Sequence, residues 1–150
     1  MTIGYRETFP RRHKNAGEEM STDFETKILD GTKRHTLRNY TVDKETRWKN
    51  AEYIHHTVRN RTSQRRVFRV QKNPKNLQRV RLEMTDRGQI DIYVLEGASI
   101  WHKLSEEKRC AFIKNDGFDS EKEFTAWFEY DVKRGMNDCL LIHYYPNYRY

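Results

Sequence analysis

Apolar and polar residues alternate over several short segments of the chain. Residues 80–84 place Val80, Leu82 and Met84 at every second position, and residues 90–94 repeat this pattern after an Asp-Arg-Gly turn. Alternation of this kind is typical of a half-buried strand, and the turn predicts that the two segments form a hairpin. Further strands are predicted at residues 2–5, 33–38, 53–58, 66–70 and 139–144.

Helical spacing of apolar residues appears in three places. Residues 22–29 begin with a possible capping box, Thr22 to Glu25, and Gly31 follows as a stop signal. Residues 105–114 form a second helical pattern. A third begins at the capping box Ser120 to Glu123 and continues with apolar residues at helical spacing. Residues 39–49 are strongly charged, and we expect a loop there.

The predicted order of elements is a strand, a helix, four or five strands, two helices and a last strand. This order favours an α+β fold with a mixed or antiparallel sheet curled towards a β-barrel, with helices over its open end. The length of 150 residues suits one domain, which begins with a strand and a polar arm extending to residue 20.

The composition combines a low apolar fraction, 35%, with a high charged fraction, 34%, and 13% aromatic residues. This many aromatic residues argues against a disordered chain, and we assign Trp101, Trp127 and Phe128 to the core. No long apolar run predicts a membrane span, and no secretory signal is apparent. We therefore expect a cytoplasmic protein without a membrane partner, in which Cys110 and Cys139 are reduced core thiols.

The net charge of +7 is concentrated in the middle of the chain. Residues 33–81 contain fifteen lysines and arginines against three acidic residues, a net charge of +12, whereas both flanking segments are net acidic. Such an asymmetry favours docking of a polyanion. The alternative is a solvated basic surface that only aids solubility.

Two basic clusters are candidates for contact with nucleic acid. Arg47, Trp48 and Lys49 combine charge with an aromatic ring, as proteins that bind single-stranded RNA do. The second cluster is an expected basic loop with the arginines Arg59, Arg61, Arg65 and Arg66. Trp48 has an alternative place in the core.

Polar residues also follow the first predicted helix. Thr36 and Arg38 share one face of a regular strand, and Lys33 joins them through its long stem or a bend near Gly31. Together they could hold a phosphate or a base edge, although an exposed strand explains the pattern equally well. Because glycine-rich phosphate loops and common metal motifs are absent, we expect no cofactor and no metal.

The segment 24–38, FETKILDGTKRHTLR, resembles the opening motif of ASCH-type domains, which belong to the PUA-like superfamily. Residues 113–128, IKNDGFDSEKEFTAWF, resemble a second family motif, in which an acidic residue precedes Gly-Phe and a helix. The strand that ends in Leu-Ile-His-Tyr at residues 141–144 is similar to the closing strand of phage and bacterial members. The resemblance covers roughly residues 20–145 and implies a PUA-like β-barrel with flanking helices.

The resemblance also implies a function. Family members are associated with RNA or modified bases, some small ones remove acetyl from N4-acetylcytidine, and others are linked to ribonuclease activity. The family's lysine, threonine and glutamate fall on Lys33, Thr36 and Asp116. Asp116 is one methylene shorter than the glutamate, and a misplacement of that size can reduce a rate about a hundredfold.

Three functions follow as hypotheses. The first is a domain that binds RNA, a nucleotide or, alternatively, DNA near Lys33, Thr36, Arg38 and Asp116. The second is a hydrolase at the same site, in which Thr36 or a water attacks, Lys33 with a lowered pKa acts as base or oxyanion partner, and Asp116 handles the proton. In the third, the protein is an adaptor that binds a host or partner protein through its acidic C-terminal half, and its basic surface is incidental. The alternative to catalysis gives the same residues simpler roles. Lys33 and Arg38 bind phosphate, Thr36 packs, and Asp116 caps the turn that follows it.

Overall fold

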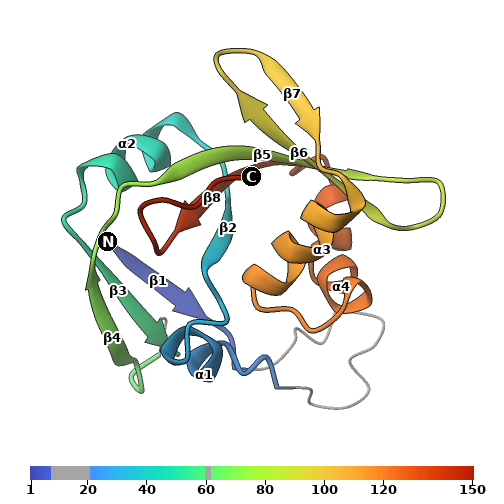
Figure 1. The fold of residues 1–150 in the computed structure, drawn as a ribbon. Coiled ribbons are helices and arrows are strands. Elements are labelled where there is room, and N and C mark those ends of the chain that lie inside the picture. Colours follow the sequence, from blue (N-terminus) through green and yellow to red (C-terminus); the bar gives the residue numbers. More distant parts are fainter. Residues whose placement is uncertain (8–20, 60–61) are drawn as a thin grey trace.

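The computed structural model describes residues 1–7, 21–59 and 62–150. Most of the polar arm therefore lies outside the described residues. The elements in chain order are β1 (Thr2–Tyr5), α1 (Phe24–Leu29), β2 (His35–Asn39), α2 (Val42–Asn50), β3 (Tyr53–Val58), β4 (Arg66–Lys72), β5 (Leu77–Met84), β6 (Ile90–Glu96), β7 (Ile100–Lys103), α3 (Glu106–Asn115), α4 (Glu121–Val132) and β8 (Asp138–His143). The predicted α+β class is confirmed (Figure 1).

The larger sheet contains five antiparallel strands in the order β2-β8-β5-β6-β7. The predicted hairpin is present as β5 and β6, with Leu82 opposite Ile92. The last strand, β8, lies between β2 and β5, so that Leu141 is opposite both Leu37 and Gln78. The last strand, β8, thus connects β2 to the rest of the sheet.

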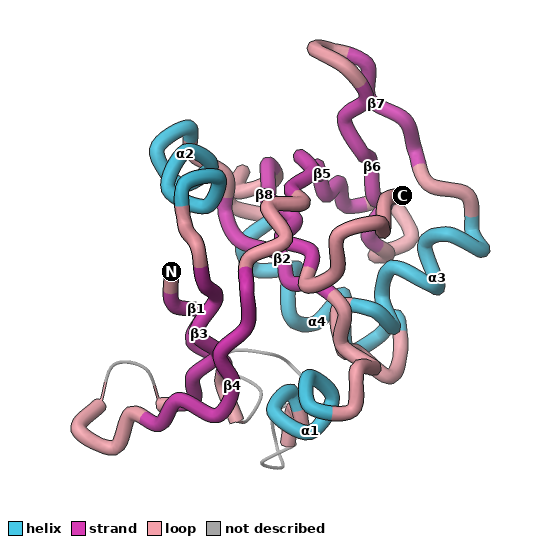
Figure 2. The backbone as a smooth tube through the Cα atoms, turned by 60° about the vertical axis from the view of Figure 1, so that its left-hand side comes forward, coloured by secondary structure: helices cyan, strands magenta, loops and turns pink. Residues whose placement is uncertain are grey.

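The smaller sheet has the order β1-β3-β4. β1 runs parallel to β3, with Ile3 opposite His56, and β4 is antiparallel to β3. A register shift between His56 and Thr57 interrupts the β3–β4 ladder. Such an irregularity bends a strand and increases its twist. In both views the smaller sheet lies to the left of β2 and β8 (Figures 1 and 2).

The two sheets stay separate rather than forming one closed barrel in the described part of the chain. β1 and β2 are edge strands of different sheets, and a side chain joins them: Arg38 Nη2 on β2 donates to the backbone oxygen of Gly4 on β1, at 3.1 Å. We call this junction the seam. A guanidinium bridge of this kind leaves room that a continuous ladder of backbone hydrogen bonds would fill.

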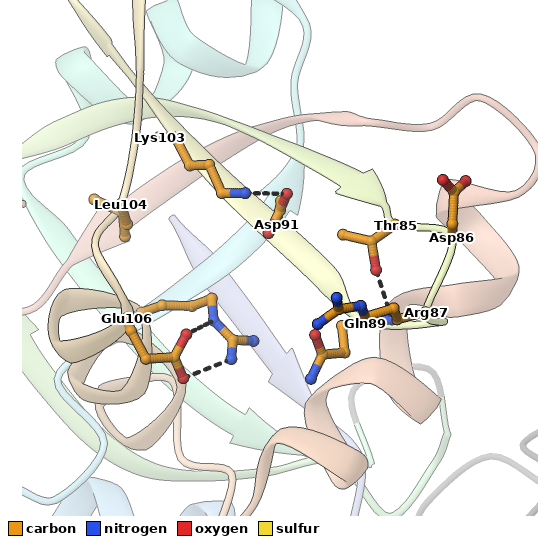
Figure 3. A pocket seen from close by; sticks show the side chains of 9 residues that line it. Thr85, Asp86, Arg87, Gln89, Asp91, Lys103, Leu104 and Glu106 are labelled. Carbon is orange, nitrogen blue, oxygen red and sulfur yellow. Dashed lines mark hydrogen bonds and ion pairs between the residues drawn. The ribbon is translucent and has the colours of Figure 1, made fainter.

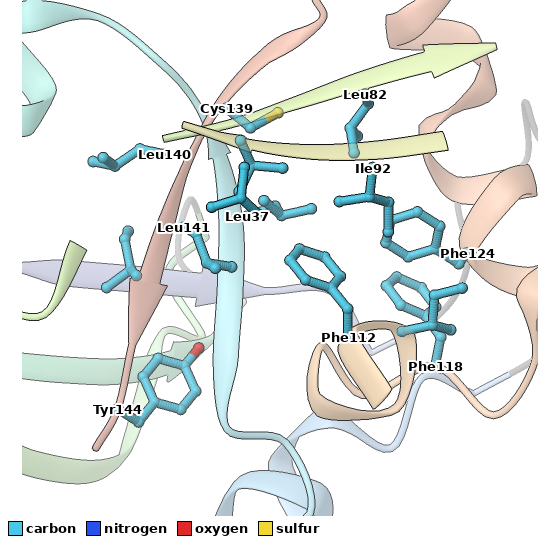
Figure 4. Packing of buried hydrophobic residues seen from close by; sticks show 14 of the residues in the cluster. Leu37, Leu82, Ile92, Phe112, Phe118, Phe124, Cys139, Leu140, Leu141 and Tyr144 are labelled. Carbon is cyan, nitrogen blue, oxygen red and sulfur yellow. The ribbon is translucent and has the colours of Figure 1, made fainter. Parts of the chain in front are cut away.

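The core lies on both faces of the larger sheet. On one face, Leu37, Leu82 and Ile92 pack towards Phe112 of α3 and Phe124 of α4 (Figure 4). The other main contributors to the core come from the smaller sheet and from α2. They are Ile3, Tyr5, Trp48 and Ile54. Because β2 and β8 lie between these two groups, they are buried on both sides and carry few charged residues.

The start of α1 differs from the prediction. The expected capping box is wrong, because Asp23 is the N-cap, has a φ of 49° and makes no side-chain capping bond, while Thr22 Oγ1 donates to the backbone of Arg6. The predicted end is correct: Gly31 has a φ of 83°, which favours glycine.

Residues 42–50 form a helix, α2, and the expected loop is wrong. Thr41 caps this helix by accepting a hydrogen bond from the backbone of Lys44, and two i,i+4 ion pairs, Asp43–Arg47 and Glu45–Lys49, lie along it. These local interactions support a helix that has a single buried residue. The high charge of this segment led to the loop prediction, and apolar spacing carries almost no signal in such a helix.

The strand β7 was not predicted. Trp101 lies on it, half-buried on the sheet surface rather than in the core, and the guanidinium of Arg81 is 4.5 Å from its ring centroid. Trp127 and Phe128 do pack against the core, as predicted. β7 follows a tight Glu-Gly-Ala-Ser turn and pairs with β6 alone. Its four residues are too few to show an alternation of apolar and polar positions.

Both cysteines are free thiols. Cys139 is buried, whereas Cys110 is exposed on α3, so the placement of Cys110 in the core is wrong. Within the described ranges, the helices are all too short and too polar to cross a bilayer.

Candidate ligand-binding site

Lys33 and Asp116 form a buried ion pair at the centre of the candidate site. Lys33 Nζ lies 2.8 Å from Asp116 Oδ1 and also donates to the backbone oxygen of Asp116. Each residue is 2% exposed. Lys33 follows the turn at Gly31, where its amide donates to Lys27, and Asp116 is the C-cap residue of α3. Two chain turns therefore bring residues 83 positions apart into contact.

Gly117 makes this contact possible. A Cβ at position 117 would lie 3.0 Å from Lys33 Cδ and 3.2 Å from Phe24 Cδ1, and the glycine has a φ of 90°. A side chain there would be strained and would push against the stem of Lys33. The Asp-Gly-Phe sequence thus supplies both the carboxylate and the space beside it.

A small pocket of about 150 Å³ adjoins the ion pair. It opens beside the seam, and residues of β1, β2, α1, α4 and the α3–α4 turn line it. Its aromatic walls come from Tyr5, Phe24, Phe118, Trp127 and Phe128. Its polar groups are Lys33, Thr36, Arg38 and Asp116, together with Arg6 at the rim. The four residues that the sequence predicted to converge thus line one pocket.

Burial dominates the electrostatics of the pair. Desolvation lowers the pKa of Lys33, the nearby carboxylate of Asp116 opposes this, and Arg38 adds a smaller lowering effect. Desolvation likewise raises the pKa of Asp116, while Lys33 opposes the shift. The lowered pKa of Lys33 that the hydrolase hypothesis required is therefore due mainly to burial, and only in smaller part to the neighbouring Arg38.

Behind the pocket lies a buried chain of hydrogen bonds that the sequence did not reveal. The hydroxyl of Tyr5 is 2.9 Å from His56 Nδ1 and 2.5 Å from the hydroxyl of Tyr144. We call these three residues the hydroxyl chain. They come from β1, β3 and the residue after β8, and only their positions in space connect them.

Most of the predicted nucleic-acid contacts are exposed but already paired with carboxylates. Arg47 pairs with Asp43, Lys49 with Glu45, Arg59 with Glu7 and Arg66 with Glu25. Surface pairs of this kind are weak and can exchange for a phosphate. Arg65 is exposed and makes no ion pair within the described ranges. Arg61 lies outside the described residues.

Trp48 does not belong to this surface. It is 4% exposed and lies in the core, where its backbone oxygen accepts a hydrogen bond from Asn73. The prediction that its ring stacks on a base is therefore wrong, and its alternative place in the core is correct. The alternation of basic and apolar residues around position 48 reflects the two faces of α2.

A second, more charged pocket lies between the β5–β6 turn, β7 and the start of α3 (Figure 3). Its charges largely satisfy one another. Lys103 pairs with Asp91 at 2.5 Å, and the buried guanidinium of Arg109 is held by Glu106 and by Glu121 of α4. We interpret this arrangement as a clamp that holds α3 and α4 against the hairpin.

His55 and His56, neighbours in β3, differ in exposure, His55 being half-buried and His56 buried. Among residues 1–7, 21–59 and 62–150, no three histidines, cysteines or carboxylates gather in a way that suits a metal ion. Comparison of the chain with protein-family models, with curated proteins and with solved structures gives no match.

Proposed function

We propose that this chain is a nucleic-acid-binding domain, with RNA or a modified nucleotide as its ligand, and that one base enters the pocket beside Lys33 and Asp116. The observation that carries the proposal is the composition of this pocket. Five aromatic side chains line a space that also contains a buried ion pair, a threonine and an arginine. Flat apolar walls and a few fixed polar groups are the usual features of a site for a heterocycle.

The size of the pocket supports a single ring. Its volume is about 150 Å³, and an engineered apolar cavity of about 150 Å³ in another protein accommodates benzene. One pyrimidine-sized ring is therefore a suitable occupant, with the sugar and phosphate outside. The ring would lie among aromatic side chains, and each stacked base contributes about 1–3 kcal/mol to binding.

The position of Arg38 suits contact with the phosphate of the ligand, which stays outside the pocket. Its guanidinium is half-buried at the seam and donates to the backbone oxygens of Leu37 and Gly4, which leaves further N–H groups for a phosphate. Arg6 is exposed at the rim of the same pocket. Phosphate contacts from such residues position a nucleic acid, and the pocket then reads the base.

The fold relationship belongs to the same proposal. We infer an ASCH-type domain of the PUA-like superfamily, in which the two curved sheets correspond to an opened barrel. The support is the resemblance of residues 24–38 and 113–128 to the family motifs, together with the fact that those two segments form one pocket.

A hydrolase at this site is the second candidate. The observation that favours it is the lowered pKa of Lys33 beside the hydroxyl of Thr36 and the carboxylate of Asp116. A lysine of this kind can act as a base or stabilise an oxyanion, as an amide or phosphodiester cleavage requires. Both Nζ contacts with Asp116 hold the ammonium in place, which suits a positioned charge better than a free nucleophile.

The experiment incubates the protein with end-labelled single-stranded RNA at 50 mM and 200 mM salt and compares native and denaturing gels. The matched variants are Arg38→Gln, at the pocket, and Arg34→Gln, whose exposed side chain does not line it. A salt-sensitive shift that Arg38→Gln weakens and Arg34→Gln retains supports binding at the seam. RNA fragments that disappear in the double variant Lys33→Met, Asp116→Leu, which removes both charges together and is checked to be folded, favour the hydrolase. No shift in the wild type contradicts the binding function.

A further inference from the structure

Aromatic rings and guanidinium groups stack on one another along the larger sheet. The guanidinium carbons of Arg81 and Arg79 on β5 lie 4.5 Å and 5.8 Å from the ring centroid of Trp101 on β7. Tyr40, the residue after β2, also contacts Arg79, whose guanidinium carbon lies 4.1 Å from its ring centroid. All three distances are within the range of cation–π interactions. We call these four residues the arginine–aromatic stack.

The arginine–aromatic stack lies on the face of the sheet that is opposite α3 and α4. Successive side chains of a strand point to opposite faces, and Leu82, which follows Arg81 along β5, packs towards Phe124 of α4 (Figure 4). The side chains of Arg79 and Arg81 are 31% and 36% exposed, and Trp101 is half-buried. Solvent, and therefore a ligand, can reach this face.

The two arginines differ in their hydrogen bonds. Asp138 on β8 accepts from Arg81 twice, from Nε at 2.8 Å and from Nη2 at 3.4 Å. The same carboxylate lies 3.8 Å from Arg79 Nη2, which is too far for a hydrogen bond. Arg79 makes no hydrogen bond with any residue of the described ranges, and its Nε is buried without an acceptor. Arg81 is thus held in place beneath Trp101, whereas the N–H donors of Arg79 are open to a ligand.

The chemistry of this face suits a single-stranded nucleic acid. Arg79 has five N–H donors in a planar fork, the geometry that a phosphate group matches. Two guanidinium groups here share one carboxylate, so the local charge is positive and attracts an anion. A half-buried ring such as Trp101 offers a surface on which a base can stack. Arginines for the phosphates and an aromatic ring for a base are the usual elements of single-strand binding.

The arginine–aromatic stack also lies close to the seam. Arg38 on β2 and Arg79 on β5 are both register partners of Leu140 on β8, one from each side. Residues that are opposite each other share a face, and neighbouring strands are about 4.8 Å apart, so the two arginines are about 10 Å apart on one face of the sheet. A strand with one phosphate at Arg38 can therefore continue to Arg79.

We infer that the arginine–aromatic stack binds the nucleotides that flank the base in the pocket, so that the ligand is a single-stranded oligonucleotide and not a free nucleotide. Arg79 contacts a backbone phosphate, and Trp101 stacks on a base. The inference rests on the proposed function for the place of the first base. Its own contacts come from residues that do not line that pocket.

The test compares the dissociation constants of cytidine 5′-monophosphate and of a single-stranded RNA hexamer of cytidylate. Trp101→Ala and Arg79→Gln should each weaken the hexamer about tenfold, the scale of one stacked base, and change the affinity for the monophosphate by less than about twofold. Arg79→Gln should also reduce the slope of log K against log salt for the hexamer by about 0.7. The arginine variant keeps the test valid if the loss of the indole loosens β7.

Two matched controls come from other surfaces of the molecule. Tyr130 on α4 is 41% exposed, and the guanidinium carbon of Arg134 lies 5.2 Å from its ring centroid, so Tyr130→Ala removes an aromatic ring of the same kind of pair. Arg87→Gln changes an exposed arginine in the turn between β5 and β6. Both controls should bind the hexamer as the wild type does.

The outcomes separate this inference from the proposed function. Unchanged hexamer affinity in both Trp101→Ala and Arg79→Gln overturns the inference, leaves the pocket standing and makes a protein the better candidate for this face. Hexamer binding that depends on the arginine–aromatic stack, with no binding of the monophosphate to the wild type, supports the inference and contradicts the base-binding pocket. If the folded wild type binds neither ligand, both are contradicted.

Discussion

Lys33 Nζ and Asp116 Oδ1 lie 2.8 Å apart in a site from which solvent is almost excluded, and each residue is 2% exposed. A buried pair is costly to desolvate, and its partners depend on each other. This relationship links stability and function, because the same two side chains form part of the wall of the pocket.

Removing one partner should destabilise the protein strongly. We expect Lys33→Met to lower the free energy of unfolding by about 3–5 kcal/mol, since it leaves an uncompensated buried carboxylate. The double variant Lys33→Met, Asp116→Leu removes both charges and should recover most of that loss. Urea unfolding of the variants measures both effects. Lys49→Met, which breaks the exposed pair with Glu45, should cost no more than about 1 kcal/mol, and a similar loss in Lys33→Met would contradict the account.

Gly117→Ala should disturb the pair without removing a charge. The new methyl group would lie 3.0 Å from Lys33 Cδ in a backbone conformation that disfavours side chains. We expect a loss of about 3 kcal/mol, combining strain of about 1–2 kcal/mol with overpacking. Gly88→Ala is the control, because Gly88 has a φ of 74° with no atom within 4 Å of an added Cβ. Equal losses in the two variants would show that the contact with Lys33 contributes nothing.

Acid should destabilise the protein below pH 6.5. Burial lowers the pKa of His56 and His143 to about 4, and it lowers the pKa of His35 as well. The unfolded chain binds protons at His56 and His143 near pH 6.5 and the folded chain only near pH 4, so stability that is present above pH 6.5 is lost as the pH falls through this window.

Each of these histidines contributes a slope of up to about 1.4 kcal/mol per pH unit. Urea unfolding at a series of pH values gives the slope, and His143→Gln should reduce it by about that amount. His102→Gln is the control, since His102 is exposed on β7 and pairs with Glu96. A stability that stays constant between pH 6.5 and pH 4 would rule out the buried neutral histidines.

Arg65 and Arg66, where the chain enters β4, offer a separate test of nucleic-acid binding. If each contacts a phosphate, changing both to glutamine should reduce the slope of log K against log salt by up to about 1.4, which is 0.7 for each contact with a single strand. Arg66 must first leave Glu25, so its share is the smaller one. The control variant Lys122→Gln, Lys133→Gln changes two exposed lysines around α4. An unchanged slope in the Arg65→Gln, Arg66→Gln variant would exclude these two arginines from the interface.

The spacing of apolar residues predicted those elements in which the apolar positions are also the buried ones. In β5, Val80 and Leu82 face the core at every second position, and Ser120 caps α4 as its sequence indicates. Helix α2 was missed for the opposite reason, because capping by Thr41 and two ion pairs support it while Trp48 alone is buried. Elements that depend on polar interactions leave little trace in an apolar pattern.

The candidate site was predictable only in part. Lys33, Thr36 and Arg38 lie close together in the sequence, and the family resemblance pointed to Asp116, so these four residues could be named in advance. Tyr5, His56 and Tyr144 come from three separate places in the chain, and no local pattern links them. Only the parallel pairing of β1 with β3 and the position of β8 between β2 and β5 bring them together.

The most direct test of the central claim is a titration of the nitrogen-15-labelled protein with cytidine 5′-monophosphate, followed by amide shifts and by Trp127 indole shifts. We predict saturable changes at Gly4, Thr36, Gly117 and Trp127, which Arg38→Gln weakens at least several-fold and Arg34→Gln leaves unchanged. Saturable binding with shifts confined to the pocket would support a base-binding site beside Lys33 and Asp116. Shifts located elsewhere, or none at millimolar nucleotide, would contradict it.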